Sequence, residues 1–93
     1  MLFCSKMVDQ EYSVRRYITE FSEETDQLLA EYELSSFDLS KFQNEFGVAD
    51  SGSPMFDCYQ IGKGNVSFLN EYLAEEPKWD FEKKSYFVES HAI

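Results

Sequence analysis

The chain has 93 residues, which is enough for one domain rather than two. Hydrophobic residues make up 43% and aromatic residues 17%, a composition that excludes a disordered chain and predicts a core built on Phe and Tyr. With 18 acidic and 8 basic residues, the formal net charge is −10, so the chain lacks the basic footprint needed to bind nucleic acid directly or to bind an anionic membrane surface. The negative charge fits either of two interpretations, solubility alone or a basic partner drawn in by opposite charge.

The first residues and the two cysteines bear on domain organisation and compartment. Residues 1–10 are expected to form an N-terminal tail ahead of a single domain over residues 11–93. Cys4 and Cys58 have neither the number nor the spacing of a disulfide framework or a metal site. Since the chain shows neither a signal peptide nor an apolar run of about 18 residues, we expect a cytoplasmic protein.

Residues 11–21, EYSVRRYITEF, are rich in Tyr, Val, Ile and Thr and therefore predict a β-strand. Alternation divides the side chains of a strand between two faces. One face then carries Tyr12, Val14 and Ile18, and the other carries Tyr17, Thr19 and Phe21.

The next stretch, FSEETDQLLAEYEL (residues 21–34), has two interpretations. Its Glu, Gln, Leu and Ala favour a helix by propensity, whereas alternation over residues 28–34 favours a strand. We favour a hairpin whose turn is SEETD, because Ser and Asp suit turns. In that hairpin, Leu28, Ala30, Tyr32 and Leu34 face the core and Glu31 and Glu33 project from the opposite face.

Residues 35–47, SSFDLSKFQNEFG, predict a helix. Ser36 or Asp38 can cap its start, and Gly47 suits the left-handed position after its end. The apolar stripe of this helix is Leu39, Phe42 and Phe46.

Three more elements are predicted after a loop over residues 48–54. Residues 55–61 alternate as a strand, with Met55, Asp57, Tyr59 and Ile61 on one face. Residues 66–76 predict a second helix that Asn65 caps and Pro77 ends, with Val66, Leu69, Tyr72 and Leu73 facing inward. Residues 79–93 predict a closing strand. The expected fold is α+β in the order ββαβαβ, a mostly antiparallel sheet of about four strands with two helices packed on one face.

No motif for catalysis or for cofactor binding accompanies this fold. His91 lies close to the C-terminus, where a base is poorly positioned, and Cys58 is expected to be a buried structural thiol. The glycines of GKGN match no phosphate-binding loop, and Asp50 and Asp57 lack the order of a calcium loop. We therefore predict no enzymatic activity, no cofactor and no metal site.

Acidic residues are concentrated in one part of the chain. Residues 19–50 hold nine of them against a single base, Lys41. The nine are Glu20, Glu23, Glu24, Asp26, Glu31, Glu33, Asp38, Glu45 and Asp50. Such a run is commonly a solvated face, but like charges brought together repel one another, and a partner rich in Lys and Arg relieves that repulsion.

Three stretches carry a resemblance: VRRYITEFSEETDQLLAEYELSSFDLSKFQNEFGV, PMFDCYQIGKGNVSFLNEYL and DFEKKSYFVESHA. Across roughly residues 12–92 the chain resembles small acidic bacterial immunity proteins of contact-dependent growth inhibition and other polymorphic toxin systems. The resemblance rests mainly on core positions, and the GKGN segment departs from the polar helix lead-in expected there. It implies a cytoplasmic antidote that binds the toxin domain delivered by a neighbouring cell.

Two hypotheses of function follow. The first is an immunity protein that binds a cognate toxin C-terminal domain, a basic nuclease, as a monomer in a 1:1 complex. The second is an acidic regulatory adaptor or nucleic-acid mimic that sequesters a basic host protein. The predicted partner-binding carboxylates are Glu23, Glu24, Asp26, Glu31, Glu33, Asp38, Asp50 and Asp57. Tyr32 and Tyr59 are predicted as aromatic anchors, with core packing as their alternative role.

Overall fold

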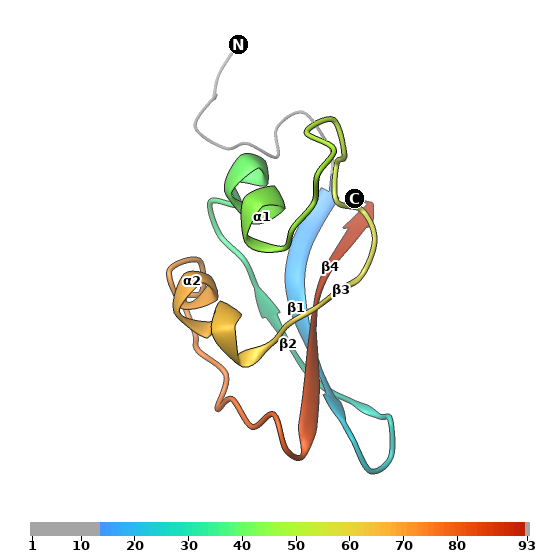
Figure 1. The fold of residues 1–93 in the computed structure, drawn as a ribbon. Coiled ribbons are helices and arrows are strands. Elements are labelled where there is room, and N and C mark those ends of the chain that lie inside the picture. The colour runs from blue at the N-terminus through green and yellow to red at the C-terminus, as the bar shows by residue number, and fades with distance from the viewer. Residues whose placement is uncertain (1–13, 93) are drawn as a thin grey trace.

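A computed structural model describes residues 14–92, and the predicted tail over residues 1–10 lies outside that range. The elements are β1 (Val14–Ser22), β2 (Leu28–Glu33), α1 (Leu39–Glu45), β3 (Tyr59–Gln60), the 3-10 turn η2 (Lys63–Asn65), α2 (Val66–Asn70) and β4 (Lys84–Ala92) (Figure 1). This order confirms the predicted ββαβαβ arrangement of a single α+β domain.

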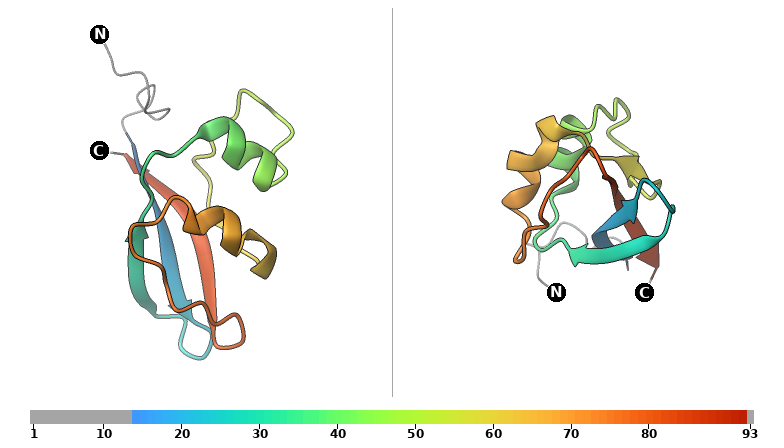
Figure 2. Two further views of the ribbon diagram at one scale, coloured as in Figure 1. Left: turned by 90° about the vertical axis from the view of Figure 1, so that its left-hand side faces the viewer. Right: turned by 90° about the horizontal axis from the view of Figure 1, so that it is seen from below.

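The four strands form one sheet in the order β2-β1-β4-β3, and all neighbours are antiparallel. The sequence could not predict this order. β1 and β4 pair along their full length, from Val14 opposite Ala92 to Ser22 opposite Lys84. The last strand thus returns to the middle of the sheet, and α1 and α2 both pack on one face of it, as predicted (Figure 2).

The stretch FSEETDQLLAEYEL is a hairpin, so the alternative of a helix is wrong. Its turn is stabilised by the Ser22 hydroxyl, which accepts hydrogen bonds from the backbone N–H groups of Glu24 and Thr25, each at 3.2 Å. Asp26 takes a left-handed conformation with φ of 59°. Asp tolerates this conformation better than most residues, which explains its place in the turn.

A β-bulge shifts the register of the hairpin between Glu20 and Phe21. One extra residue in a strand reverses the faces of all residues beyond it. Tyr32 therefore faces the core as predicted, but Leu28 does not: it lies opposite Phe21 and is 50% exposed. The prediction that Leu28 belongs to the core is wrong for this reason.

The helix predicted over residues 35–47 is present but starts later, at Leu39. Ser36 has φ of 57°, which is incompatible with a helix, so Asp38 is the cap and its carboxylate accepts from the Lys41 N–H at 3.3 Å. Gly47 has φ of 68°, the left-handed conformation predicted after the helix end.

The strand predicted over residues 55–61 is only two residues long, Tyr59–Gln60. Met55 has φ of 53°, which interrupts extended backbone, and Asp57 is exposed rather than aligned with Met55 on a strand face. Met55 is nevertheless buried, because Arg16 binds the backbone carbonyls of Pro54 and Met55 and holds this segment against the sheet.

The second predicted helix is also shorter than expected, since α2 ends at Asn70 rather than at residue 76. Asn65 does not cap α2 with its side chain. Its side-chain oxygen accepts from the Gly62 N–H at 2.9 Å, and its amide donates to Glu45 at 2.8 Å, which joins the 3-10 turn to α1. The closing strand begins at Lys84, five residues later than predicted.

The core lies between the sheet and the two helices. Its fully buried side chains include Ile18, Phe42, Leu69 and Tyr86. Phe42 is the centre of an aromatic cluster, with ring centroids 4.2 Å from Phe37, 4.9 Å from Phe68 and 4.9 Å from Tyr72. Among the described residues, no helix is long and apolar enough to cross a membrane.

Candidate partner-binding surface

The face of the sheet opposite α1 and α2 carries a mixture of acidic and aromatic side chains. Successive side chains of a strand point to opposite faces, and paired residues on neighbouring strands point to the same face. The face away from the core is therefore made of every second residue of each strand. We call this surface the open sheet face, and it consists of Arg15, Tyr17, Thr19, Phe21, Leu28, Glu31, Glu33, Phe87 and Glu89.

Arg15 joins two of the predicted carboxylates on this face. Its guanidinium forms ion pairs with Glu31, at 3.0 Å, and with Glu33. The same guanidinium lies 4.0 Å from the centroid of the Tyr17 ring. The hydrogen bonds that Arg15 donates to Glu33 and Glu31 raise the pKa of its guanidinium. One cation between two carboxylates leaves this corner of the open sheet face with net negative charge.

A second contact continues the open sheet face onto β4. The Thr19 hydroxyl donates a hydrogen bond to Glu89 at 2.6 Å, and Thr19 itself is only 4% exposed. Phe21 and Phe87 follow along the same two strands, with ring centroids 5.9 Å apart in an edge-to-face arrangement. The face therefore combines oriented carboxylates with the half-buried rings of Phe21 and Phe87, whereas the Tyr17 ring beside Arg15 is buried, at 8% exposed.

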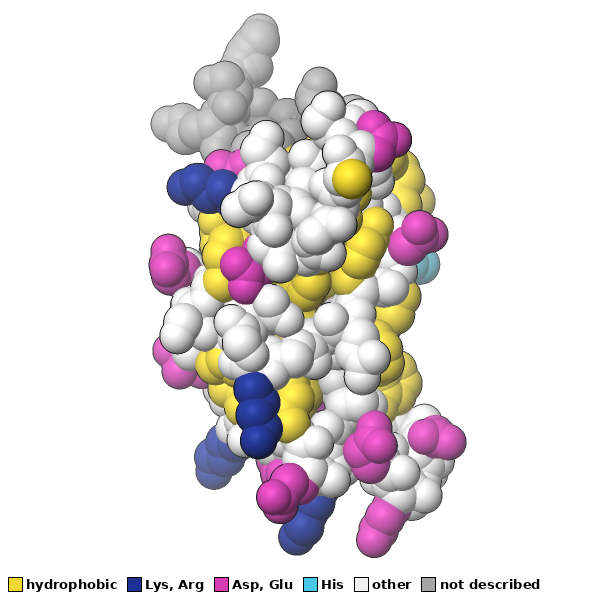
Figure 3. Space-filling model, in the orientation of Figure 1, with side chains coloured by type: hydrophobic (Ala, Val, Ile, Leu, Met, Phe, Trp, Pro, Cys, Tyr) yellow, Lys and Arg dark blue, Asp and Glu magenta, His cyan; other side chains and the backbone are white. Residues whose placement is uncertain are grey.

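The predicted turn acids Glu23, Glu24 and Asp26 are all exposed at the tip of the hairpin. Acidic side chains gather over the hairpin turn at the lower right of the space-filling view, whereas the other acids on that side of the molecule are scattered (Figure 3). A hollow of about 450 Å³ lies between this turn and the start of β4, and its lining is Ser22, Glu23, Glu24, Leu29, Glu82, Lys83 and Lys84.

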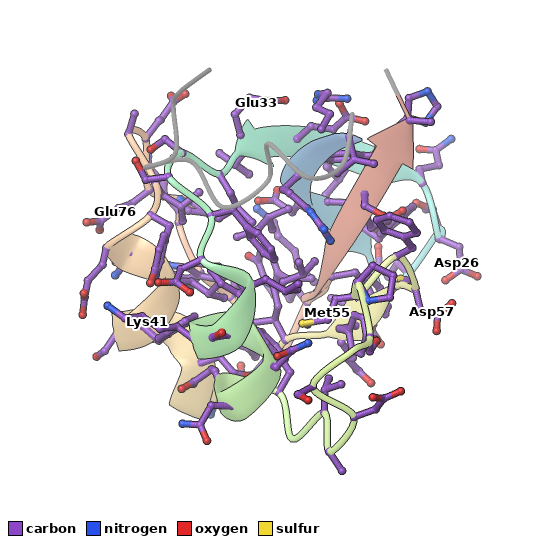
Figure 4. All side chains as sticks on the ribbon, turned by 90° about the horizontal axis from the view of Figure 1, so that it is seen from above. Asp26, Glu33, Lys41, Met55, Asp57 and Glu76 are labelled. Atoms are coloured by element: carbon purple, nitrogen blue, oxygen red, sulfur yellow. The ribbon has the colours of Figure 1, made fainter. Side chains whose placement is uncertain are left out.

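The other predicted carboxylates do not join this surface. Asp38 caps α1, and Asp50 accepts a hydrogen bond from the Gly52 N–H at 2.9 Å within the loop after that helix. Asp57 lies just before β3, at the opposite edge of the sheet from Glu33 on β2 (Figure 4). The run of acids is therefore not one continuous edge, although its members are close in sequence.

Tyr32 and Tyr59 both pack against the hydrophobic core, on the helix side of the sheet. The Tyr32 hydroxyl donates to Glu20 at 3.1 Å, and the Tyr59 ring lies 6.3 Å from that of Phe46. The structure thus places them in the alternative role of core packing, away from the open sheet face.

Glu20 is a correction to the predicted acidic surface, because it is only 4% exposed. It lies on the core side of β1, where its carboxylate pairs with Lys84 at 3.2 Å and accepts from Tyr32. The hydrogen bond and charge of Glu20 raise the pKa of Lys84. The charge of this acid is thus satisfied within the fold and does not contribute to the surface.

Sequence reasoning missed Arg15 and Glu89 as members of the surface. Alternation alone does place Arg15 beside Tyr17, Thr19 and Phe21, so the first strand held a signal for it. Glu89 joins them only because β4 pairs with β1 in the register that sets it opposite Tyr17. No local pattern in the sequence contains that pairing.

The remaining reactive side chains that the structure describes include Cys58 and His91. Within residues 14–92, no group of three or more His, Cys, Asp or Glu side chains could hold a metal ion. Cys58 is exposed, contrary to the expected burial. Partial desolvation of its thiol raises the pKa of that group, and the negative charge of Glu89 raises it further. His91 is exposed near the end of β4.

The tyrosines predict loss of stability at alkaline pH. Burial raises the pKa of Tyr17, Tyr32, Tyr72 and Tyr86 above the ordinary value of about 10. Between that value and the raised one, the folded protein holds protons that the unfolded chain has lost. The contribution of these tyrosines to the free energy of unfolding is therefore fully present below about pH 10, and it is lost as the pH rises further. Urea unfolding at pH 8, 10 and 11, with phenolate absorbance followed in parallel, checks this, and unchanged stability at pH 11 would contradict it.

Comparison with known proteins adds a family but no activity. No curated protein matches the chain. A family model matches residues 15–89, from the second residue of β1 to nearly the end of β4, and so covers every element of the fold together with the open sheet face. On that match, the chain belongs to the family described as Domain of unknown function (DUF7683).

Proposed function

We propose that this protein is an immunity protein that acts in the cytoplasm, where it binds a cognate toxin C-terminal domain as a 1:1 complex and neutralises it. The toxin domain is a basic nuclease in this proposal. The observation that supports it is the open sheet face, where the register places Glu31, Glu33 and Glu89 on the same face as the half-buried ring of Phe87.

The mechanism is electrostatic and steric. Carboxylates on a rigid sheet stand in for the phosphates of a nucleic acid and cover the cleft where a nuclease binds its substrate. Charge complementarity speeds diffusional encounter, and the gain falls steeply with ionic strength. The exposed acids of the hairpin turn extend the negative field beyond the sheet and help to orient the partner on approach.

Co-expression tests the function directly. Cells that produce the toxin domain encoded immediately upstream of this protein should survive when the protein is present and die when it is absent. If the folded protein fails to rescue such cells, the immunity function is excluded, and the alternative of an acidic adaptor for a basic host protein becomes the better hypothesis.

Charge reversal at Glu31 and Glu33 tests the surface. The double variant Glu31→Lys with Glu33→Lys should slow association with the toxin domain by about 10- to 100-fold at low salt. The matched control is Glu71→Lys with Glu76→Lys, which changes the net charge equally at exposed positions after the end of α2. Stopped-flow association rates at several salt concentrations measure both variants. Equal rates for the two variants would remove the open sheet face from the interface.

A further inference from the structure

Within residues 14–92, the outer side of β2 is a sheet edge without a further strand. β2 is the first strand in the sheet order, and its partner there is β1. The Leu34 N–H donates to the Arg16 carbonyl at 3.0 Å, so the backbone groups of Leu34 point toward β1. In an antiparallel pair every second residue does so, which includes Tyr32. The backbone N–H and C=O groups of Glu31 and Glu33 therefore point outward. Among the described residues, the next segment on this side is 73–75: Leu73 pairs with Leu34 just past the end of β2, and Ala74 and Glu75 line a hollow together with Glu31 and Glu33.

This edge lacks two of the features that prevent strands from pairing with one another, Pro and Lys, and it keeps two others, the β-bulge near Leu28 and the charges of Glu31 and Glu33. Residues 28–33, LLAEYE, contain no Pro and no Lys, and Leu29 is 48% exposed. A second copy of the chain is an unfavourable occupant, because pairing two β2 strands would bring the carboxylates of Glu31 and Glu33 from both copies together, and each copy carries a net charge of −10. The charge pattern thus opposes self-association and leaves the edge available to a basic strand.

A hollow of about 220 Å³ lies along the same edge. Its lining is Glu31, Tyr32, Glu33, Ala74 and Glu75. Three of these five residues are acidic, and the side chains of Glu31 and Glu33 are 39% and 59% exposed. The outward backbone groups and the two carboxylates thus belong to the same strand of six residues, and the hollow lies beside them.

We propose that β2 accepts an extended basic segment of the partner protein as a fifth strand of the sheet. Main-chain hydrogen bonds to Glu31 and Glu33 would supply affinity, and alternate side chains would supply specificity. Lys or Arg at every second position meets the two carboxylates, and small apolar residues between them enter the hollow beside Tyr32. The inference rests on the proposed function in taking the partner to be basic, and it adds how that partner is held.

A peptide probe tests edge addition without the toxin. The probe is an eight-residue peptide of alternating Lys and Val, and the control peptide alternates Glu and Val. When the Lys–Val peptide occupies nine-tenths of the protein, hydrogen exchange of the outward amides of Glu31 and Glu33 should slow by about tenfold. The Glu–Val peptide should leave both exchange rates unchanged. Unchanged exchange with saturating Lys–Val peptide would overturn the inference.

A backbone substitution separates the strand edge from its charge. Glu31→Pro removes the outward N–H and is tolerated at a free edge, whereas Glu31→Ala removes the same carboxylate and keeps the N–H. Affinity for the Lys–Val peptide should fall at least tenfold further in Glu31→Pro than in Glu31→Ala. Equal affinities would overturn edge addition. Neither outcome depends on rescue by co-expression, so failure of this inference and failure of the immunity function are distinguishable.

Discussion

Replacing Phe42 with Ala is expected to lower the free energy of unfolding by about 3–5 kcal/mol. Phe42 is fully buried, and its ring contacts Phe37, Phe68 and Tyr72, so the substitution leaves a cavity bounded by side chains from three segments. A domain of this size has a total stability of about 5–15 kcal/mol, so the variant should be close to unfolding at 37 °C. Urea unfolding followed by circular dichroism measures the change.

Two further variants serve as controls for Phe42→Ala. Phe42→Leu keeps most of the volume and should cost less than Phe42→Ala. Leu28→Ala removes a large apolar side chain that is half exposed, and it should change stability by less than about 1 kcal/mol. If Phe42→Ala and Leu28→Ala lowered stability equally, the aromatic cluster between α1 and α2 would not be the centre of the core.

Replacing Arg16 with Met should lower the free energy of unfolding by about 3–5 kcal/mol. The Arg16 guanidinium donates to the Met55 carbonyl at 2.6 Å and to the Pro54 carbonyl at 2.8 Å, and it stacks 4.3 Å from the centroid of Phe37. Met retains the apolar stem but leaves both carbonyls without this donor. The segment around residues 54–56 should then separate from the sheet, and limited proteolysis should cleave the loop after α1 faster than in the parent protein.

The neighbouring arginine provides the control for this substitution. Arg15 lies on the opposite face of the same strand, where its ion pairs with Glu31 and Glu33 are exposed to solvent. Exposed ion pairs contribute little, so Arg15→Met should lower stability by less than about 1 kcal/mol. Arg16→Lys should lie between the two, since an ammonium cannot span both carbonyls while stacking on a ring. Equal losses for Arg15→Met and Arg16→Met would show that Arg16 does not hold the loop.

Much of the fold could be predicted from local patterns. Alternation in residues 14–22 predicted β1, and the turn chemistry of SEETD outweighed the helix propensity of the residues after it. Gly47 marked the end of α1, and Asp38 was one of the two residues expected to cap its start, Ser36 being the other. These predictions succeeded because strand faces, caps and turns depend on residues that are neighbours in the chain.

The errors occurred where a contact between distant segments decided the local conformation. A strand over residues 55–61 is the natural prediction from alternation, but the bonds from Arg16 hold Pro54 and Met55 in another conformation. The helix after Asn65 is short because Tyr72 and Leu73 pair with residues 34 and 35 near the end of β2 instead of continuing the helix. Tertiary contacts of this kind override local propensity, and no pattern within either segment reveals them.

The sequence by itself determined the fold class, the hairpin and the excess of negative charge. Only the tertiary structure decided where that charge lies: Glu20 is paired inside, Asp38 and Asp57 are directed elsewhere, and Glu89 is brought beside Glu31 and Glu33. The physical reason is that the number of charges is a property of composition, whereas their arrangement depends on the register of β1 with β2 and β4. One bulge and one long antiparallel pairing set that register.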